Sequence, residues 1–378
     1  MEGMAGTRSR LTWAVNLAAL LLVVLWTIPT LGLLISSFRD RDQIAASGWW
    51  RAALSAEQNE IFRAPPPETA VPEGPLWVLD GNVFGEAGGS VAAFGLSARE
   101  PKAFAPGETA TGRAGDTLTV AKDGAFRITY PEAPEAGRGD RVFVTTTTPP
   151  RLTLENYETV IVAQGLGRAF LNTFTVTIPA TVIPILIAAF AAYALAWMRF
   201  PGRALILAGI VGLLVVPLQM TLIPLLRLHN AIGLDKGYLG IWLAHTAFGL
   251  PMAVFLLRNY IAGLPREIIE SARVDGATEF EIFRRIVLPL SFPALASFAI
   301  FQFLWVWNDL LVATVFLGNA PDQLVMTGVL RELLGSLGGE WEILAASAFV
   351  SISMPLLVFF GLQRYLVRGL LAGSVKGG

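Results

Sequence analysis

The chain has 378 residues, of which 54% are hydrophobic and 15% are charged, whereas a soluble domain is about half apolar and about a quarter charged. Its formal net charge is -1, so it carries no surplus of positive charge for binding a polyanion such as nucleic acid. It has no cysteine and two histidines, His229 and His245, which excludes disulfides, thiolate chemistry and almost every zinc site.

Six apolar segments are long enough to cross a bilayer, which takes about 20 mostly apolar residues. The first, at residues 11–38, is too long for the apolar region of a signal peptide, and no small-x-small cleavage site follows it directly. The others lie near residues 169–197, 204–226, 237–257, 292–318 and 343–363. The sequence therefore predicts an all-α polytopic membrane protein with six transmembrane helices, whose two termini lie on the same side.

Lysine and arginine are unevenly distributed among the short loops between these segments. They occur before the first segment, between the second and third, between the fourth and fifth, and after the sixth. The opposite short loops contain only Arg227, Lys236 and Arg331. Because basic residues favour the cytoplasmic side, we expect cytoplasmic termini, a cytoplasmic loop at 258–290 and an external segment at 42–167.

The external segment is rich in Gly, Pro, Thr, Glu and Asp instead of Leu. Alternating stretches at 117–120 and 125–130 predict strands. Turns are expected at Asp80-Gly81, at Asp123-Gly124 and in the glycine-rich stretch 85–89. We expect a small β-rich domain of about 80–100 ordered residues. A partly disordered loop is the alternative, given the Pro and Gly content.

The loop at 258–290 has the pattern of two short helices. Pro265 suits the start of the first, where its missing N–H is not needed, and Gly276 suits the left-handed geometry of a helix end. The stretch from Thr278 to Glu281 has the form of a capping box for the second helix. Pro289 is expected to end that helix.

The second helix is predicted to be amphipathic. Phe280, Phe283 and Val287 recur at helical spacing, while Arg284 and Arg285 remain on the polar side. By spacing alone, this helix pair also fits an ordinary amphipathic connection between two spans.

A spaced motif runs through the same loop. Glu270-Ser271-Ala272 is followed by Gly276 and then, after nine residues, by Ile286-Val287-Leu288-Pro289. Small residues allow close helix approach, glycine permits a tight turn, and Glu270 and Asp275 can pair with basic groups. The motif resembles the EAA loop of binding-protein-dependent ABC import permeases, with Ser271 in place of the usual first alanine.

The resemblance implies the type I ABC importer permease fold and a location in a bacterial inner membrane. It also implies that the loop forms a coupling helix, which is seated in a cleft of a cytoplasmic ATPase. The coupling residues that it implies are Glu270, Ser271, Ala272, Asp275, Gly276, Ile286, Leu288 and Pro289.

Other segments resemble the MalG-type branch of these permeases, which imports sugars: residues 171–173, 191–196, 199–203, 307–309 and 369–377. In maltose-type transporters such a tail reaches between the ATPase subunits, which implies an ATPase contact at Gly373, Ser374, Val375 and Lys376. The segment at 42–167 departs from the common pattern and is similar to the longer permeases assigned to α-glucosides. The implied function is import of a carbohydrate, such as an α-glucoside or another oligosaccharide.

ATP hydrolysis is expected on another subunit, because the sequence has no G-x-x-x-x-G-K-[ST] stretch to cradle phosphates. The chain is therefore not predicted to be an enzyme or to hold a cofactor, and ATP and Mg²⁺ belong to the partner. The resemblance implies a second permease subunit in a heterodimer, an ATPase homodimer and an extracytoplasmic solute-binding protein, besides membrane lipid. Three alternatives are a permease for a non-sugar solute, a membrane-embedded enzyme, and a carbohydrate-binding module on a membrane anchor.

A solute path needs polar groups inside the membrane, where burying them is costly. The candidates in the fifth span are Phe301, Trp305, Asn308 and Asp309, because aromatic faces with nearby acceptors suit sugar rings. Gln219 and His245 are further candidates. The alternative is that Asn308 and Asp309 hold helices together by hydrogen bonds and that His245 is an interhelical donor.

The predicted organisation has four parts. Residues 1–41 form the N-terminal tail and first helix, 42–167 the external insert, 168–363 the remaining helices with the 258–290 loop, and 364–378 a cytoplasmic tail. The external loop at 318–341 contains an amphipathic stretch. The matching loop of maltose-type permeases reaches into the binding protein, and a short helix on the membrane surface is the alternative.

Overall fold

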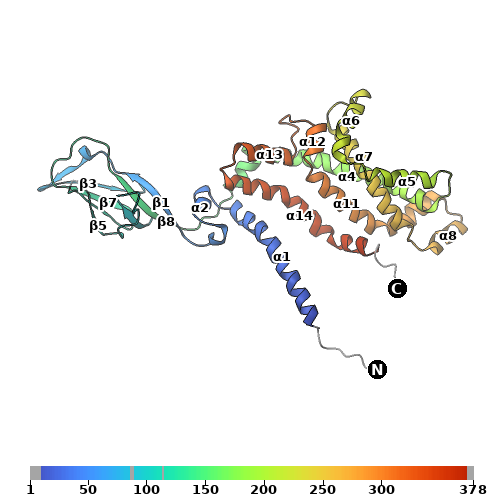
Figure 1. Ribbon diagram of the computed structural model, residues 1–378, viewed down its shortest axis with the longest axis horizontal. Coiled ribbons are helices and arrows are strands. Elements are labelled where there is room, and N and C mark those ends of the chain that lie inside the picture. Colours follow the sequence, from blue (N-terminus) through green and yellow to red (C-terminus); the bar gives the residue numbers. More distant parts are fainter. Residues whose placement is uncertain (1–9, 86–88, 113–114, 373–378) are drawn as a thin grey trace, which may run out of the picture. The chain divides into compact units, whose positions relative to one another are not determined.

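The computed structural model describes residues 10–85, 89–112 and 115–372, and the chain divides between Asn156 and Tyr157 into two compact units. The first unit contains a long helix and all of the described strands, whereas the second is helical. Figure 1 shows both units and labels many of their elements.

The first unit begins with α1 (Arg10–Ser37), a long helix of almost entirely apolar residues. Its side chains from residue 11 to residue 31 are exposed. An apolar helix with this much exposed surface is typical of a membrane span. A short helix α2 (Arg41–Ala46) and a 3-10 helix (Trp49–Arg51) follow.

The strands of the first unit form two antiparallel sheets. They are β1 (Ala56–Arg63), β2 (Val71–Glu73), β3 (Leu76–Asn82), β4 (Val91–Gly95), β5 (Thr109–Thr111), β6 (Thr117–Val120), β7 (Ala125–Tyr130) and β8 (Arg141–Thr148), with a 3-10 helix at Pro67–Thr69. One sheet has the order β1-β8-β4 and the other the order β2-β3-β7-β6-β5. A buried apolar cluster that includes Phe94, Leu118, Phe126 and Val144 contains residues of both sheets. The strands expected at 117–120 and 125–130 are β6 and β7.

The turn expected at Asp80-Gly81 is wrong, because both residues lie inside β3, opposite Arg127 and Phe126 of β7. Asp80 accepts two hydrogen bonds from the Arg127 guanidinium, each 2.8 Å long. A Cβ atom on Gly81 would lie 2.5 Å from the Phe126 ring, so the glycine allows close packing within a strand. At Asp123-Gly124 the expected turn is present, and Gly124 has a φ of +85°.

The second unit is built around four long helices. They are α4 (Leu166–Trp197), α7 (Tyr238–Ile261), α11 (Phe292–Trp307) and α14 (Trp341–Ala372). Helix α4 packs along α7 and α11, and α11 packs along α7 and α14 (Figure 1). The shorter elements are α3 (Glu155–Glu158), a π-helix (Thr159–Ala163), α5 (Arg203–Leu213), α6 (Leu218–Ala231), α8 (Arg266–Val274), α9 (Glu279–Ile282), a second π-helix (Phe283–Val287), α10 (Leu288–Leu290), α12 (Leu311–Phe316) and α13 (Met326–Ser336).

Three of the prolines inside the long helices create contacts between these helices. A proline has no N–H, so it leaves the carbonyl four residues earlier without its helical partner. In α4, Pro179 frees the Thr175 carbonyl, which accepts a hydrogen bond from the Trp242 indole of α7 at 2.8 Å. Pro184 frees the Ala180 carbonyl, which accepts from the Gln302 amide of α11 at 3.1 Å.

The same arrangement recurs between α11 and α14. Pro355 lies inside α14 and frees the Ser351 carbonyl, which accepts a hydrogen bond from the Trp307 indole of α11 at 3.0 Å. Trp307 is buried. A side chain of a neighbouring helix therefore satisfies each of these three freed carbonyls, as the interior of a bilayer requires.

Four helices among the described residues are long and apolar enough to cross a membrane: Leu11–Ser37 of α1, α4, α7, and Trp341–Tyr365 of α14. Two bent pairs have the composition of a span as well, namely α5 with α6, and Glu279–Leu290 with α11. Within the described ranges there are thus four candidate spans, or up to six if each bent pair counts as one.

The segment expected to form a span at 204–226 is not one continuous helix. It is broken into α5 and α6, which meet at an angle of 110°. The break ends at Pro217, which cannot donate a helical hydrogen bond and disfavours helical geometry in Val216 before it.

The segment expected at 292–318 is also broken, after α11. Asp309 lies in the gap, and its carboxylate accepts the N–H groups of Val312 at 3.3 Å and Ala313 at 3.0 Å. A carboxylate in this position satisfies free N–H groups at a helix start. Asp309 therefore stabilises the start of a new helix, α12, at the point where α11 has ended.

Helix α13 lies in the segment at 318–341. Its side chains Met326, Val329 and Leu333 are buried in an apolar cluster with residues of α4 and α14. A helix held on the membrane surface by its apolar side would present these side chains to lipid, whereas here they pack against the protein. The opposite side is open, and Leu334 is 63% exposed.

Candidate functional site

The segment at 258–290 begins in the last turn of α7 and contains a sharp turn between α8 and α9. Helix α8 begins directly after Pro265 and ends at Val274. Gly276 has a φ of +83°, and its N–H donates to the Arg273 carbonyl at 3.1 Å. The predicted left-handed helix end is confirmed, since glycine adopts this geometry without strain.

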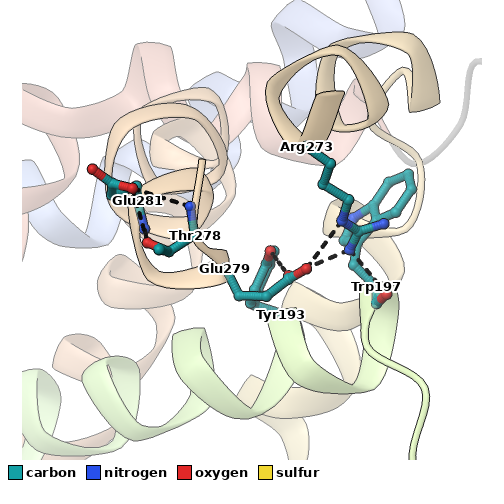
Figure 2. Close-up of polar contacts among 6 residues, drawn as sticks. All are labelled: Tyr193, Trp197, Arg273, Thr278, Glu279 and Glu281. Carbon is teal, nitrogen blue, oxygen red and sulfur yellow. Dashed lines mark hydrogen bonds and ion pairs between the residues drawn. The ribbon is translucent and has the colours of Figure 1, made fainter. Parts of the chain in front are cut away.

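Helix α9 begins with the predicted capping box, which is confirmed. The Thr278 hydroxyl accepts the Glu281 N–H at 3.3 Å, and the Glu281 carboxylate accepts the Thr278 N–H at 3.0 Å. Figure 2 shows the two side chains beside each other at the first turn. Two free N–H groups of the helix start are therefore satisfied locally.

The expected end of the second helix at Pro289 is wrong. After α9 the chain continues through the π-helix and α10, and Ser291 follows as the end. The Leu288 N–H donates to the Phe283 carbonyl, so the hydrogen-bond pattern has already shifted before Pro289. The proline falls in the first turn of α10, where its missing N–H is not needed.

One side of this segment packs into an apolar core with α4 and α7. The buried members from the part of the segment after α7 are Ile269, Ile282, Phe283 and Val287. Phe280 was expected on this side but is 59% exposed. Because α9 is short and a π-turn follows it, the residues of its first turn do not continue the buried face.

The predicted coupling residues separate into two groups. Ala272, Ile286 and Leu288 pack against the apolar core, so they anchor the segment to the rest of the unit. The exposed group consists of Glu270, Ser271, Asp275, Gly276 and Pro289. Only this second group is available to a partner.

The sequence did not lead us to expect two exposed apolar side chains near the turn. Val274 is 87% exposed and Phe280 is 59% exposed. Each is flanked by charged residues on both sides, as Arg273-Val274-Asp275 and Glu279-Phe280-Glu281. An apolar residue isolated between charges is the signal that identifies them, and large exposed apolar side chains are enriched at protein interfaces.

A polar network connects α8 and α9 to the end of α4 (Figure 2). Arg273 donates to both carboxylate oxygens of Glu279, at 3.0 Å and 3.3 Å, and the Tyr193 hydroxyl donates to the same carboxylate at 2.5 Å. Arg273 also reaches the Trp197 carbonyl at 3.4 Å, and the Trp197 indole donates to the Ile261 carbonyl at 3.0 Å. Burial raises the pKa of Glu279, but the hydrogen bonds from Tyr193 and Arg273 outweigh it and leave the pKa below its ordinary value.

Residues 166–371 match the protein family described as binding-protein-dependent transport system inner membrane component, and they make up more than half of the chain. The chain belongs to this family. The α-glucoside transport system permease protein AglG of Rhizobium meliloti is 65% identical over 376 residues, which cover 98% of this permease and 99% of AglG. The osmoprotective compounds uptake permease protein GgtD of Synechocystis is 60% identical over 223 residues, which cover 59% of this permease and 75% of GgtD.

A chain in the crystal structure of a bacterial ABC transporter that imports alginate is 23% identical, with a TM-score of 0.47 over 58% of this permease and 81% of that chain. The predicted resemblance to ABC sugar permeases is confirmed by the family and by AglG. This permease is a membrane component of an ABC importer with the type I permease fold, and it is not an enzyme. ATP is hydrolysed by a separate subunit.

The candidate solute-path residues of this permease do not lie together. Phe301 is 49% exposed, and Asn308 is also exposed. Trp305 packs edge-on against His245, with 5.1 Å between the ring centroids. The Asp309 carboxylate is buried and lies 3.7 Å from His245 Nε2. The structure thus groups Trp305, His245 and Asp309, and it leaves Phe301 and Asn308 at the surface.

Neither ring nitrogen of the buried His245 has a hydrogen-bond partner among the described residues. The expected interhelical hydrogen bond from His245 is therefore wrong. Gln219 is exposed on α6. Within the described ranges, no three His, Asp or Glu side chains are grouped so that they could hold a metal ion. The predicted ATPase contact at Gly373, Ser374, Val375 and Lys376 lies outside the described residues.

The capping contact of Asp309 predicts how its variants behave. Asp309→Ala removes both acceptors for the α12 start and is expected to destabilise the permease by about 1 kcal/mol. Asp309→Asn keeps one acceptor oxygen and is expected to reduce the stability by less. Melting temperatures of the detergent-solubilised chain measure this difference. The solute concentration at half-maximal uptake should remain unchanged in both variants. If this concentration rose in both variants without a loss of stability, Asp309 would instead be in contact with solute.

Proposed function

We propose that this permease imports an α-glucoside or a related oligosaccharide across the bacterial inner membrane. The main support is the 65% identity to AglG, an α-glucoside transport permease, over 98% of the chain. A match of this extent includes the β-strands as well as the helices. The match to GgtD, which is named for osmoprotective compounds, leaves out about two fifths of the chain, since it covers 59%. An α-glucoside is therefore the better-supported solute class.

The proposed topology has six spans: α1, α4, the bent pair of α5 and α6, α7, the pair that contains α11, and α14. In the pair that contains α11, only α11 crosses the membrane. Both termini and the 258–290 segment face the cytoplasm, and the strands and α13 face outside. The support is the concentration of arginine and lysine in alternate loops.

The proposed partners are a second permease subunit, an ATPase homodimer that binds ATP and Mg²⁺, and an extracytoplasmic solute-binding protein. The exposed side of the 258–290 segment is the proposed ATPase contact, with Val274 and Phe280 as apolar anchors beside the Gly276 turn. Glu270 and Asp275 add negative charge to the same segment. The tail at 373–376 is proposed to reach between the ATPase subunits.

The proposed solute path includes Phe301, Trp305 and Asn308 of α11 and its end. Solute pockets are commonly lined by aromatic side chains with a few polar groups, and this composition suits a sugar ring. Asp309 is proposed to hold these residues in place without contacting solute, through its hydrogen bonds to α12 and its contact with His245.

Competition between sugars tests the proposed solute class. Proteoliposomes that contain the assembled transporter, with ATP on the ATPase side, are expected to take up radiolabelled trehalose, in which two glucose units are α-linked. Unlabelled maltose should reduce the initial rate because it shares the α-linkage. Cellobiose is the matched control, since it has the same size but a β-linkage. Equal competition by maltose and cellobiose would contradict the α-glucoside assignment.

The coupling role predicts a specific effect of Gly276→Val. Within the described residues nothing lies within 4 Å of a Cβ atom placed at Gly276, so the strain would come from its φ of +83° and not from crowding. A left-handed valine costs about 1–2 kcal/mol, which should displace α8 from α9. We expect uptake to fall about tenfold, as that cost implies, while the ATPase activity persists.

Gly276→Asn is the control for this experiment, because asparagine tolerates left-handed geometry better than valine. It should retain most of the uptake. Normal coupled uptake by the valine variant in the same proteoliposomes would rule out a coupling role for the turn.

Single cysteines test the proposed sides and partners, since the native chain has none. Leu334→Cys on α13 is expected to crosslink to the solute-binding protein, and Val274→Cys is expected to crosslink to the ATPase. Thr327 is a poorer probe because its hydroxyl donates to the Asp309 carbonyl at 2.8 Å. Each probe serves as the control for the other. Capture of the same partner by both probes would overturn the topology.

A further inference from the structure

The apolar contact between the 258–290 segment and α4 is not directional by itself. On the α4 side it is formed by small side chains, including Ala188, Ala189 and Ala192, which are buried. Small residues allow helices to approach closely, but apolar burial depends on area and not on orientation. A coupling segment held only in this way would be free to slide along α4.

The contact of Glu279 is directional, in contrast. Its two carboxylate oxygens accept the fork of the Arg273 guanidinium, which connects α8 and α9 across the Gly276 turn. One of these oxygens also accepts the Tyr193 hydroxyl of α4, and the Tyr193 side chain is buried against Phe283. Charge-assisted bonds of this geometry fix orientation as well as distance. The two helices of the segment are therefore tied to each other and to α4.

The other end of α4 is tied in a similar way to the segment that leads into α13. The Asn172 amide donates to the carbonyls of Asp322 and Leu324, both at 2.9 Å. The Thr173 hydroxyl accepts the N–H of Met326, the first residue of α13, at 2.9 Å. The N-terminal part of α4 thus holds the backbone on which α13 begins.

Between these two ends α4 is one helix, braced where it contains prolines. Asn172 and Tyr193 are separated by about 30 Å along the axis, at 1.5 Å per residue, which is about the thickness of the hydrocarbon core. The Trp242 and Gln302 side chains satisfy the carbonyls freed by Pro179 and Pro184. The helix is thereby held against both α7 and α11 along its length.

We propose that α4 is the mechanical link between the two partner-binding faces of this permease, with Asn172 and the Tyr193–Glu279–Arg273 network as its positioning contacts. The inference rests on the coupling and binding-protein contacts proposed above. Displacement of the 258–290 segment by the ATPase moves α4 through Glu279, and α4 moves the start of α13 through Asn172. The coupling operates equally in the reverse direction, since a coupling free energy between two sites is reciprocal.

The test is stimulation of the ATPase by solute-loaded binding protein, measured on the complete transporter in proteoliposomes. Tyr193→Phe removes one hydroxyl and keeps the ring that packs on Phe283. Asn172→Ala removes the amide that holds the start of α13. Each variant is expected to reduce the stimulation about tenfold, the usual effect of losing one charge-assisted or buried hydrogen bond. Basal ATPase activity and assembly should stay within about twofold of the native complex.

Two control variants remove a similar group that takes no part in the contacts at either end of α4. Glu281→Gln removes a charge that bonds only within α9 and its cap among the described residues, apart from its ion pair with Arg285 at 3.8 Å. Thr175→Val removes a hydroxyl that donates within α4, to the Leu171 carbonyl at 3.0 Å. Both should keep the native stimulation. A loss equal to that of Tyr193→Phe and Asn172→Ala would overturn the link.

The double variant Asn172→Ala/Tyr193→Phe decides whether the two ends act through one element. Breaking either end of a single link interrupts it, so the double variant should lose no more than either single variant. Losses that multiply would show independent effects and overturn the proposal, as would native stimulation in both single variants. Failure of the proposed function is distinguishable, because the native complex itself would then show no stimulation by the binding protein.

Discussion

A carbonyl that loses its helical partner inside a membrane needs another donor, and this requirement organises the helical unit. Water is not available in the hydrocarbon core to satisfy it. Pro179, Pro184 and Pro355 each free one carbonyl, and Trp242, Gln302 and Trp307 supply the missing donors. Each of these bonds joins a different pair of helices, namely α4 with α7, α4 with α11, and α11 with α14. The prolines therefore fix the register of the long helices against one another.

Helix α4 takes part in two of these three contacts, and another part of its surface packs against the 258–290 segment. The small side chains Ala188, Ala189 and Ala192 leave room for the segment to pack closely. The Tyr193 hydroxyl then reaches Glu279 at the surface of the same core. Packing brings the segment near α4, and the polar bonds determine its orientation. Loop positions that contact neither α4 nor α7, such as Val274, remain exposed for a partner.

The break between α11 and α12 shows the same need for hydrogen-bond partners, here for backbone N–H groups. A helix that stops inside a span leaves free N–H groups at the start of the next helix. Asp309 satisfies two of them with its carboxylate, which explains an acidic residue in an apolar segment without any contact to solute. His245 lies beside it, against Trp305. A buried acid in a span is thus not by itself evidence of a transport path.

The sequence alone determined the features that depend on bonds within a few residues. Gly276, Thr278 and Glu281 form a helix end and a capping box through neighbouring backbone groups, so their pattern is legible without a structure. The apolar composition likewise located the four unbroken candidate spans of the described residues, and the spacing from Glu270 to Pro289 identified the family.

Only the tertiary structure decided which distant side chains meet. Asp80-Gly81 has the composition of a turn, yet pairing with Arg127 and packing of Phe126 place it inside a strand. The partners of Glu279 and the donors for the proline-freed carbonyls come from other helices. Residue types close in sequence carry no record of such contacts, because they depend on the angle and register at which two elements pack.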